Sequence, residues 1–269
     1  MSKKLKSALV VEGGAMRGIF AAGVLDSMQH LHSKHFDFVI GVSAGSLNIS
    51  SWLANQAGRN KVIITKYCTS KSFLNFSKLF IGKSAIDLKW LWDITEQQCP
   101  IDWSYLFRNT TEFYVVTTSL SSMKAKYDQI KKNNYQALLS ASCSIPFLSK
   151  QLPEYQGDLR VDGGFTDSIP IIKAYQMGAR DITCILSRPL GYEMAAKTKL
   201  PILSNRKMVK LFKDREKTYN KALEFLKSPP SDCSIKIIAP PSDFKVTRFT
   251  KDLKLLEEGY YQGLNSIVF

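Results

Sequence analysis

The chain has 269 residues, of which 45% are hydrophobic and 11% aromatic, and these values exclude an intrinsically disordered protein. The formal net charge is +14, from 37 Lys and Arg against 23 Asp and Glu, and the basic residues are spread along the chain. No basic stripe with interleaved aromatic residues is present, which disfavours a nucleic-acid-binding protein and leaves a solvated basic surface or contact with an anionic membrane.

The beginning of the chain does not resemble a secretory signal. Its apolar stretch, Ala8–Val11, has only four residues, and no stretch approaches the roughly 18 apolar residues of a membrane span. The five cysteines are scattered without a Cys-x-x-Cys pair, which indicates neither a zinc site nor a redox motif. We therefore expect reduced thiols and a cytoplasmic protein, with peripheral membrane contact as an option.

The first 57 residues predict two βα units. The apolar run Ala8–Val11 is typical of a strand buried on both faces, and apolar residues recur at helical spacing between Ile19 and Leu31. A second apolar run, Phe36–Gly41, leads into another helical pattern from Leu47 onward. This βαβα order implies a parallel sheet with right-handed crossovers.

The rest of the chain mixes strands with helices. Residues 60–108 hold aromatic residues without one period, which predicts short helices and loops that could form a cap. Further strands are predicted at 112–120, 125–127, 159–161, 181–186 and 234–239, with the second pairing with the first. Helices are predicted at 135–141, 201–226 and 249–267, and the last two look like long basic surface helices.

A candidate nucleophile lies where the second strand turns into a helix. Gly41-Val42-Ser43-Ala44-Gly45 fits the pattern G-x-S-x-G. Such a sharp turn exposes the central serine at the carboxyl end of a strand, and glycines on either side avoid a clash with the returning helix. The helix N-terminus adds amide groups beside the serine. The five-residue pattern also fits an ordinary β–α turn.

A glycine-rich loop, Gly13–Gly18, follows the first strand. Consecutive backbone N–H groups in such a loop can bind a phosphate or a developing oxyanion. A dinucleotide site is disfavoured because the first two glycines are adjacent, and because Ser43 stands where the fingerprint requires an acidic residue.

The general base would have to be a carboxylate. The three histidines, His30, His32 and His35, all precede Ser43. A helix places His30 about 18 Å from Gly18, and an extended strand places His35 about 25 Å from Ser43. Asp162, followed by two glycines at a strand end, is the candidate, although alone it also fits a common turn.

Together these motifs resemble the patatin-like phospholipase family, in its bacterial branch. The glycine-rich loop, the Ser43 elbow and Asp162-Gly-Gly correspond to the family's three motifs in order. Residues 140–147 are similar to its Ala-Ser-x-Ala-x-Pro stretch, and 167–170 to its Asn/Ser-x-Pro. The resemblance covers about residues 7–190. The chain departs from it in starting its loop with Gly-Gly and in carrying Ser168 in place of Asn.

The resemblance implies an α/β fold: a three-layer α/β/α sandwich around a mostly parallel sheet. We expect one catalytic domain over 1–269, with 191–269 completing the fold. It implies that Ser43 and Asp162 form a dyad that cleaves acyl esters of phospholipids, lysophospholipids or neutral lipids without a metal or other cofactor. It implies an oxyanion hole in the loop and the elbow, which we assign to Gly13, Gly14, Ala15, Met16, Arg17, Gly18 and Ala44.

Several alternatives stay open at this point. Arg17 could bind a phosphate head group or serve as loop scaffold by pairing with a carboxylate. An acyltransferase would use the same acyl-enzyme with an alcohol or thiol acceptor. A non-catalytic lipid- or nucleotide-binding protein would keep the loops alone. The natural lipid and the oligomeric state are not encoded in these patterns.

Overall fold

The computed structural model describes residues 5–31, 35–146, 148–149, 152–195 and 206–267. Its described part contains an eight-stranded sheet in the order β5-β6-β3-β2-β1-β7-β8, with β4 also paired to β3. The strands are β1 (Lys6–Val11), β2 (Phe38–Val42), β3 (Glu112–Ser119), β4 (Ala125–Gln129), β5 (Glu154–Tyr155), β6 (Asp158–Asp162), β7 (Ala179–Ile185) and β8 (Ser234–Ile238).

The centre of the sheet is parallel, as predicted. β3, β2, β1, β7 and β8 run in one direction, whereas β4 and β6 pair antiparallel with β3. β1 shows why the run Ala8–Val11 is apolar throughout: Ala8 and Val10 belong to the core on one face, and Leu9 and Val11 to the core on the other. A strand covered on both faces has no position for a polar side chain.

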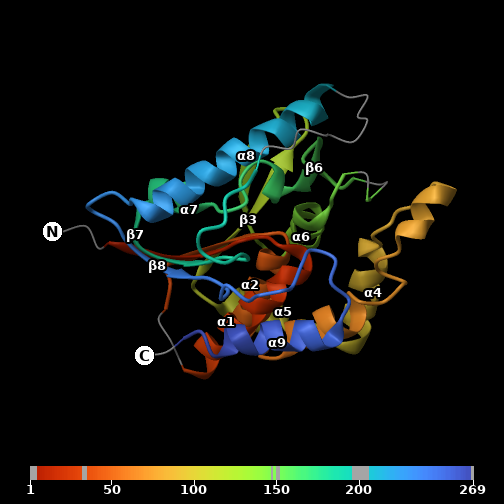
Figure 1. Ribbon diagram of the computed structural model, residues 1–269, viewed down its shortest axis with the longest axis horizontal. Coiled ribbons are helices and arrows are strands. Elements are labelled where there is room, and N and C mark those ends of the chain that lie inside the picture. Colours follow the sequence, from red (N-terminus) through yellow and green to blue (C-terminus); the bar gives the residue numbers. More distant parts are fainter. Residues whose placement is uncertain (1–4, 32–34, 147, 150–151, 196–205, 268–269) are drawn as a thin grey trace.

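Helices cover both faces of this sheet (Figure 1), so the predicted three-layer architecture is confirmed. α7 (Ile171–Gln176) and α8 (Arg206–Lys227) lie on one face. On the other face lie α1 (Gly18–His30), α2 (Ala44–Leu53), α5 (Trp103–Arg108) and α9 (Leu253–Leu264). Residues 201–205 of the predicted helix 201–226 lie outside the described residues. In this described part no helix is long and apolar enough to cross a membrane.

The C-terminal segment is packed closely onto the beginning of the chain. An added Cβ at Gly23 of α1 would lie 2.1 Å from the carbonyl oxygen of Tyr260, and one at Gly263 of α9 would lie 2.1 Å from that of Phe20. These contacts are with backbone, which cannot rotate away. Glycines on both helices therefore permit the close crossing, and α9 buries one face instead of lying free on the surface.

The segment predicted as short helices and loops forms a layer beside α2. It contains α3 (Arg59–Val62), a π-helical turn (Ile63–Tyr67), a 3₁₀ helix (Phe76–Ile81), α4 (Leu88–Gln98) and α5. The predicted strand at 125–127 is present as β4 and pairs with β3, and the predicted helix at 135–141 is α6 (Tyr135–Cys143).

Candidate active site

Ser43 occupies a strained turn between β2 and α2. Its backbone has φ 52° and ψ −126°, a conformation that a residue with a side chain rarely adopts and that costs about 1–3 kcal/mol. An added Cβ at Gly41 would lie 2.6 Å from the Cα of Ser46, and one at Gly45 would lie 2.5 Å from the carbonyl oxygen of Val11. Both glycines of the motif are therefore required by close backbone approach.

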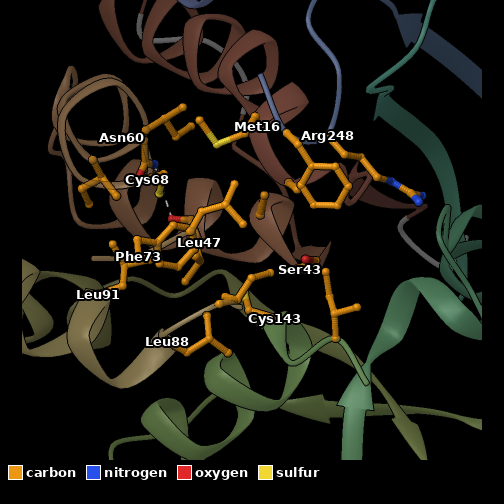
Figure 2. A pocket seen from close by; sticks show the side chains of 18 of the residues that line it. Met16, Ser43, Leu47, Asn60, Cys68, Phe73, Leu88, Leu91, Cys143 and Arg248 are labelled. Atoms are coloured by element: carbon orange, nitrogen blue, oxygen red, sulfur yellow. Dashed lines mark hydrogen bonds between the residues drawn. The ribbon is translucent and has the colours of Figure 1, made fainter. Parts of the chain in front are cut away.

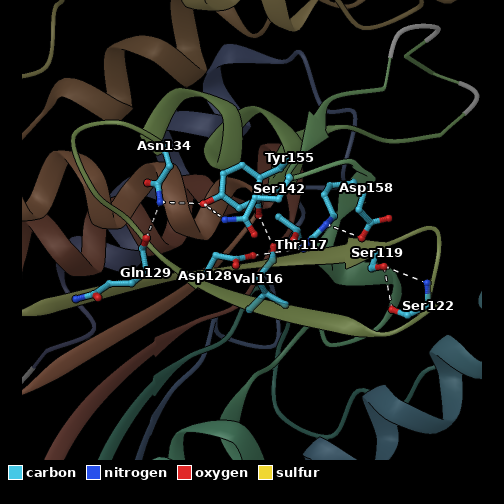
Figure 3. A network of polar contacts seen from close by, with 12 residues as sticks. Val116, Thr117, Ser119, Ser122, Asp128, Gln129, Asn134, Ser142, Tyr155 and Asp158 are labelled. Carbon is cyan, nitrogen blue, oxygen red and sulfur yellow. Dashed lines mark hydrogen bonds and ion pairs between the residues drawn. The ribbon is translucent and has the colours of Figure 1, made fainter.

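Helix α6 holds the turn from behind. The backbone N–H of Ser43 donates to Ser142 Oγ at 2.8 Å. That hydroxyl in turn donates to the carbonyl oxygen of Val116 in β3 at 2.8 Å, as Figure 3 shows. The hydroxyl of Ser46 donates to the Ser43 carbonyl oxygen at 2.6 Å. The N–H and carbonyl groups of Ser43 are thus both hydrogen-bonded within the fold, and its hydroxyl takes no part in these bonds.

The register of the sheet brings Asp162 to the level of Ser43. Val42 in β2 is paired with Val116 in β3, so Ser43 lies level with Thr117; Thr117 is in turn paired with Asp162 of β6. One carboxylate oxygen, Oδ1, accepts from the backbone N–H of Gly164 at 2.7 Å. Both side chains of the pair are buried, with 8% exposure each.

The environment raises the pKa of the Asp162 carboxyl above 3.8. Burial is the largest cause, because a carboxylate loses hydration inside the protein. The hydrogen bonds from the Ser43 side chain and the Gly164 amide act in the opposite direction, as do the charges of Arg215 and Arg248. The same side chain that contacts Ser43 is thus a carboxyl group with an increased affinity for a proton.

Beneath this pair lies a polar network centred on a buried arginine. Arg160 of β6 donates to Thr117 Oγ1 at 3.1 Å and forms ion pairs with Asp158 at 2.8 Å and Asp128 at 3.4 Å. Figure 3 shows these contacts tying β3, β4 and β6 together. Because a buried charge is costly unless paired, the network favours the single strand register that aligns Asp162.

The backbone amides of the glycine-rich loop divide into two groups. Met16 donates to Arg248 O at 3.4 Å, Arg17 donates to Gly14 O at 3.2 Å, and Gly18 donates to carbonyls within the loop. For the remaining amides no acceptor is found among the described residues; these belong to Gly13, Gly14, Ala15 and, at the elbow, Ala44. Ala15 has φ 50°, which turns the loop sharply at this point.

Arg17 is built into the scaffold of the loop. The residue is buried, and its guanidinium donates to Ser187 Oγ at 3.1 and 3.3 Å. The carboxylate of Glu12 accepts from the Ser187 N–H at 2.6 Å and from the Tyr219 hydroxyl at 3.1 Å. Burial lowers the pKa of Arg17 to about 10, and the charge of Glu12 opposes that shift. Of the two roles considered, the contacts favour the scaffold.

An apolar pocket opens beside Ser43 (Figure 2). The segment predicted as a cap supplies about half of its wall, and the rest comes from α2, α6 and the residues after it, the glycine-rich loop, and Arg248 and Phe249 of the loop between β8 and α9. Its apolar lining includes Leu47, Ile63, Ile64, Phe73, Leu88 and Leu91. Residues 60–91 therefore cover this side of the serine, at the carboxyl edge of the sheet.

Cys143 was not singled out from the sequence as a site residue. It lines the pocket beside Ser43, and burial raises the pKa of its thiol, with a hydrogen bond to the Ser43 side chain opposing that shift. Arg215 and Arg248 were also missed, although both line a second pocket with Ser43 and Asp162. The local pattern carries no signal for either arginine, since one lies in a basic helix and the other in a loop.

The histidines of the described part lie away from the serine. His35 lies near Thr110, with their side-chain atoms 3.2 Å apart at the beginning of β3, the opposite edge of the sheet from Ser43. His30 ends α1. His32 lies outside the described residues, as does Phe147 of the stretch following α6.

The chain is similar to known proteins over most of its length. Residues 9–175 match the family model described as patatin-like phospholipase, and residues 205–267 match a domain of unknown function (DUF6363). The chain is 30% identical over 265 residues to the uncharacterized protein YjjU of Escherichia coli strain K12, covering 95% of this chain and 74% of that protein. The crystal structure of VipD from Legionella pneumophila aligns with a TM-score of 0.49 at 12% identity, over 98% of this chain and 66% of that one.

Proposed function

We propose that this chain, which belongs to the patatin-like phospholipase family, hydrolyses acyl esters of lipids with Ser43 as nucleophile and Asp162 as its base. The observation that carries the proposal is that the strand register brings these two side chains level on either side of β3, where both line one pocket. A serine hydroxyl needs a proton acceptor within hydrogen-bond reach to attack a carbonyl carbon, and we assign this role to the buried carboxyl of Asp162, whose pKa is lowered by a hydrogen bond with the Ser43 side chain.

In the proposed reaction, Asp162 accepts the hydroxyl proton while Ser43 Oγ bonds to the ester carbonyl carbon. The tetrahedral intermediate collapses by breaking the bond to the alkoxy oxygen, and the proton on Asp162 passes to the departing alcohol. Water then attacks the acyl-enzyme, with Asp162 taking its proton. The acyl group leaves as a fatty acid and Ser43 regains its hydrogen.

Free amides beside the serine support the placement of the oxyanion. Gly13, Gly14, Ala15 and Ala44 have no acceptor among the described residues, and three of them line the pocket that holds Ser43 and Asp162. We propose that these four groups donate to the oxyanion. Met16, Arg17 and Gly18 shape the loop, since their N–H groups are already bonded. One oxyanion donor is typically worth about 3 kcal/mol of transition-state stabilisation.

The apolar pocket is evidence that the ester substrate carries a long acyl chain. Most of the side chains that line it are hydrophobic, so a hydrocarbon chain that enters it is removed from water, which stabilises binding by about 0.8 kcal/mol per CH₂. Ser43 lies at the wall of this pocket, which would place the ester carbonyl beside Oγ once the chain is inside.

An exposed apolar turn supports peripheral contact with an anionic membrane. The 3₁₀ helix Phe76–Ile81 projects beside α4 (Figure 1) and exposes Phe80 by 92% and Ile81 by 68%. Residues 66–83 carry four lysines and no Asp or Glu. Phe76 packs on Phe249, which lines the pocket beside Ser43, so the turn lies next to the entrance used by a lipid. Apolar side chains flanked by lysines suit an anionic bilayer surface.

Covalent labelling with a fluorophosphonate, followed by peptide mapping, tests the catalytic proposal. We expect modification at Ser43, complete loss of labelling in Ser43→Ala, and normal labelling in Ser77→Ala, which removes an exposed hydroxyl. Undiminished ester hydrolysis by the purified Ser43→Ala protein would contradict the proposal. Product analysis in the presence of an added alcohol separates hydrolysis from acyl transfer, because only transfer yields a new ester.

Sedimentation with vesicles tests the membrane contact. Ile81→Ser and Phe80→Ser should each weaken binding to vesicles of phosphatidylglycerol. Leu5→Ser is the matched control, since Leu5 is 69% exposed at the opposite edge of the sheet. If all three variants bind these vesicles equally, the proposed surface is excluded. It is also excluded if the unsubstituted protein binds phosphatidylcholine vesicles as well as phosphatidylglycerol vesicles.

A further inference from the structure

Two arginines from the C-terminal segment border the pocket that contains Ser43 and Asp162. Arg215 lies on α8, and Arg248 lies in the loop between β8 and α9. Both lie beyond residues 9–175, which match the patatin-like model, and within residues 205–267, which match the domain of unknown function. The segment without an assigned role therefore supplies two positive charges to the candidate catalytic pocket.

Neither guanidinium forms an ion pair within the described residues, although the charge of Asp162 in the same pocket acts on both. The ion pairs of that part of the chain involve other residues, and the buried Nε of Arg215 makes no hydrogen bond. Arg215 lies over the ring of Phe165, with 5.5 Å from its central carbon to the ring centroid. A partly buried guanidinium without an acceptor is unusual, because each such donor lost to burial costs about 1–3 kcal/mol.

The charges of the two arginines act on one another. Burial and the charge of Arg248 together lower the pKa of Arg215 to about 10, against the opposing charges of Asp162 and Glu12, so Arg215 still carries its proton near pH 7. Two like charges at one wall of a pocket are mutually destabilising, and an anion between them would relieve that cost.

Arg17 shows by contrast what a structural arginine looks like in this protein. Its guanidinium donates twice to Ser187 and faces the carboxylate of Glu12, so its donors and its charge are used inside the fold. Arg215 and Arg248 lack comparable contacts. Arg215 borders only the pocket that contains Asp162, whereas Arg248 borders both that pocket and the apolar pocket and therefore lies where the two meet.

We propose that Arg215 and Arg248 bind the phosphodiester of a glycerophospholipid or lysophospholipid while the acyl chain occupies the apolar pocket. The proposal rests on the hydrolase function proposed above. Guanidinium groups suit phosphate because their planar donors match its oxygens in pairs. The C-terminal segment then sets the preference for phosphorylated over neutral lipids, and the loop and dyad perform the chemistry.

Matched short-chain lipids test this preference. The substrates are dihexanoylphosphatidylglycerol and dihexanoylglycerol as monomers, which share acyl chains and differ in the phosphate. We compare kcat/KM for the phospholipid with kcat/KM for the neutral lipid and take their ratio. Arg215→Gln and Arg248→Gln should each lower this ratio by roughly tenfold, because each removes one charge-assisted hydrogen bond to the phosphate. The change should appear chiefly in KM. Lys213→Gln, which removes an exposed charge from the same helix, should leave the ratio unchanged.

Binding to the Ser43→Ala protein, measured by calorimetry, keeps the test independent of turnover. Dihexanoylphosphatidylglycerol should bind more tightly than dihexanoylglycerol, and the Arg248→Gln change should remove most of that difference. Inorganic phosphate is the third ligand: if it binds more tightly than the phospholipid, the site holds a free anion and the head-group assignment is wrong.

The two proposals fail in distinguishable ways. Fluorophosphonate labelling at Ser43 together with an unchanged substrate ratio in both arginine variants would overturn the head-group site alone. Absence of labelling and of hydrolysis would overturn the hydrolase, and the calorimetric comparison would still decide whether the arginines bind phosphate.

Discussion

Asp162 lies directly across β3 from Ser43, with Thr117 between them in the register of the sheet. Because β6 runs antiparallel to β3, it comes from beyond the carboxyl edge of the parallel strands and ends at the level of the serine. Strands lie about 4.8 Å apart, so two side chains on either side of one strand can reach each other. The distance between the elbow and the carboxylate is thus set by the width of a single strand.

The pH at which activity is lost on acidification should follow the pKa of the buried Asp162 carboxyl. Burial raises the pKa of Asp162, and the reaction needs its ionised form, so kcat/KM should fall on acidification at a pH above the value of about 4 expected for an exposed Asp. Arg215→Gln removes a charge that lowers this pKa, so the fall should move to higher pH. The measurement is a pH profile of kcat/KM with a monomeric p-nitrophenyl ester.

Lys213→Gln is the control for that shift, because it removes an exposed charge from α8. If kcat/KM of the unsubstituted protein falls only at or below pH 4, Asp162 is not the base. The same conclusion follows if Lys213→Gln shifts the pH of this fall as far as Arg215→Gln does.

A bulkier side chain in the apolar pocket should shorten the preferred acyl chain. Leu88 lines that pocket, so Leu88→Trp should exclude the far end of a long chain. Losing burial of two methylenes costs about 1.6 kcal/mol, which predicts a fall of more than tenfold in kcat/KM for p-nitrophenyl laurate relative to butyrate. Leu5→Trp, at the opposite edge of the sheet, should leave that ratio as it is; a ratio unchanged in both variants would place the acyl chain elsewhere.

A methyl group at the α1–α9 crossing should destabilise the fold. The new Cβ of Gly263→Ala would lie 2.1 Å from the Phe20 carbonyl oxygen, so the helices must separate. We expect the free energy of unfolding to fall by about 2 kcal/mol or more, although alanine has the higher helix propensity. Urea denaturation measures it, and Glu258→Ala on the exposed face of α9 is the control. Equal stability of the two variants would show that the crossing adapts at little cost.

Asp167 should make the protein less stable as the pH rises through mildly acidic values. Burial raises the pKa of Asp167 to about 6, and hydrogen bonds from Tyr127 and the Ile169 amide oppose that shift. Between about pH 4 and pH 6 the folded state holds a proton that the unfolded chain has released, so the contribution of Asp167 to stability declines across that window, by at most about 3 kcal/mol.

The Asp167→Asn variant should lose this decline, because an amide does not titrate. The test is urea unfolding of both proteins at several values between pH 4 and pH 7, with Asp243→Asn as a control at an exposed position. A variant with the same pH dependence as the wild type would assign the effect to other groups.

Much of the fold follows from local pattern. The runs Ala8–Val11 and Phe36–Gly41 predicted buried parallel strands, and these are β1 and β2. The elbow at Ser43 was placed correctly between a strand and a helix, because its two glycines are required by contacts within a few residues or with the adjacent strand. The start of the helix predicted at 249–267 was wrong by four residues: Asp252 caps α9 by accepting from the N–H groups of Lys254 and Leu255.

The sequence by itself determined the family, the parallel core and the elbow that presents Ser43, because each depends on the order of residues along a short stretch. Only the tertiary structure decided which loop amides remain free, that Cys143 lies against the serine, and that Arg215 and Arg248 face the same pocket. These relationships join segments about a hundred or more residues apart. They follow from strand register and helix packing, and no local pattern of residues encodes either.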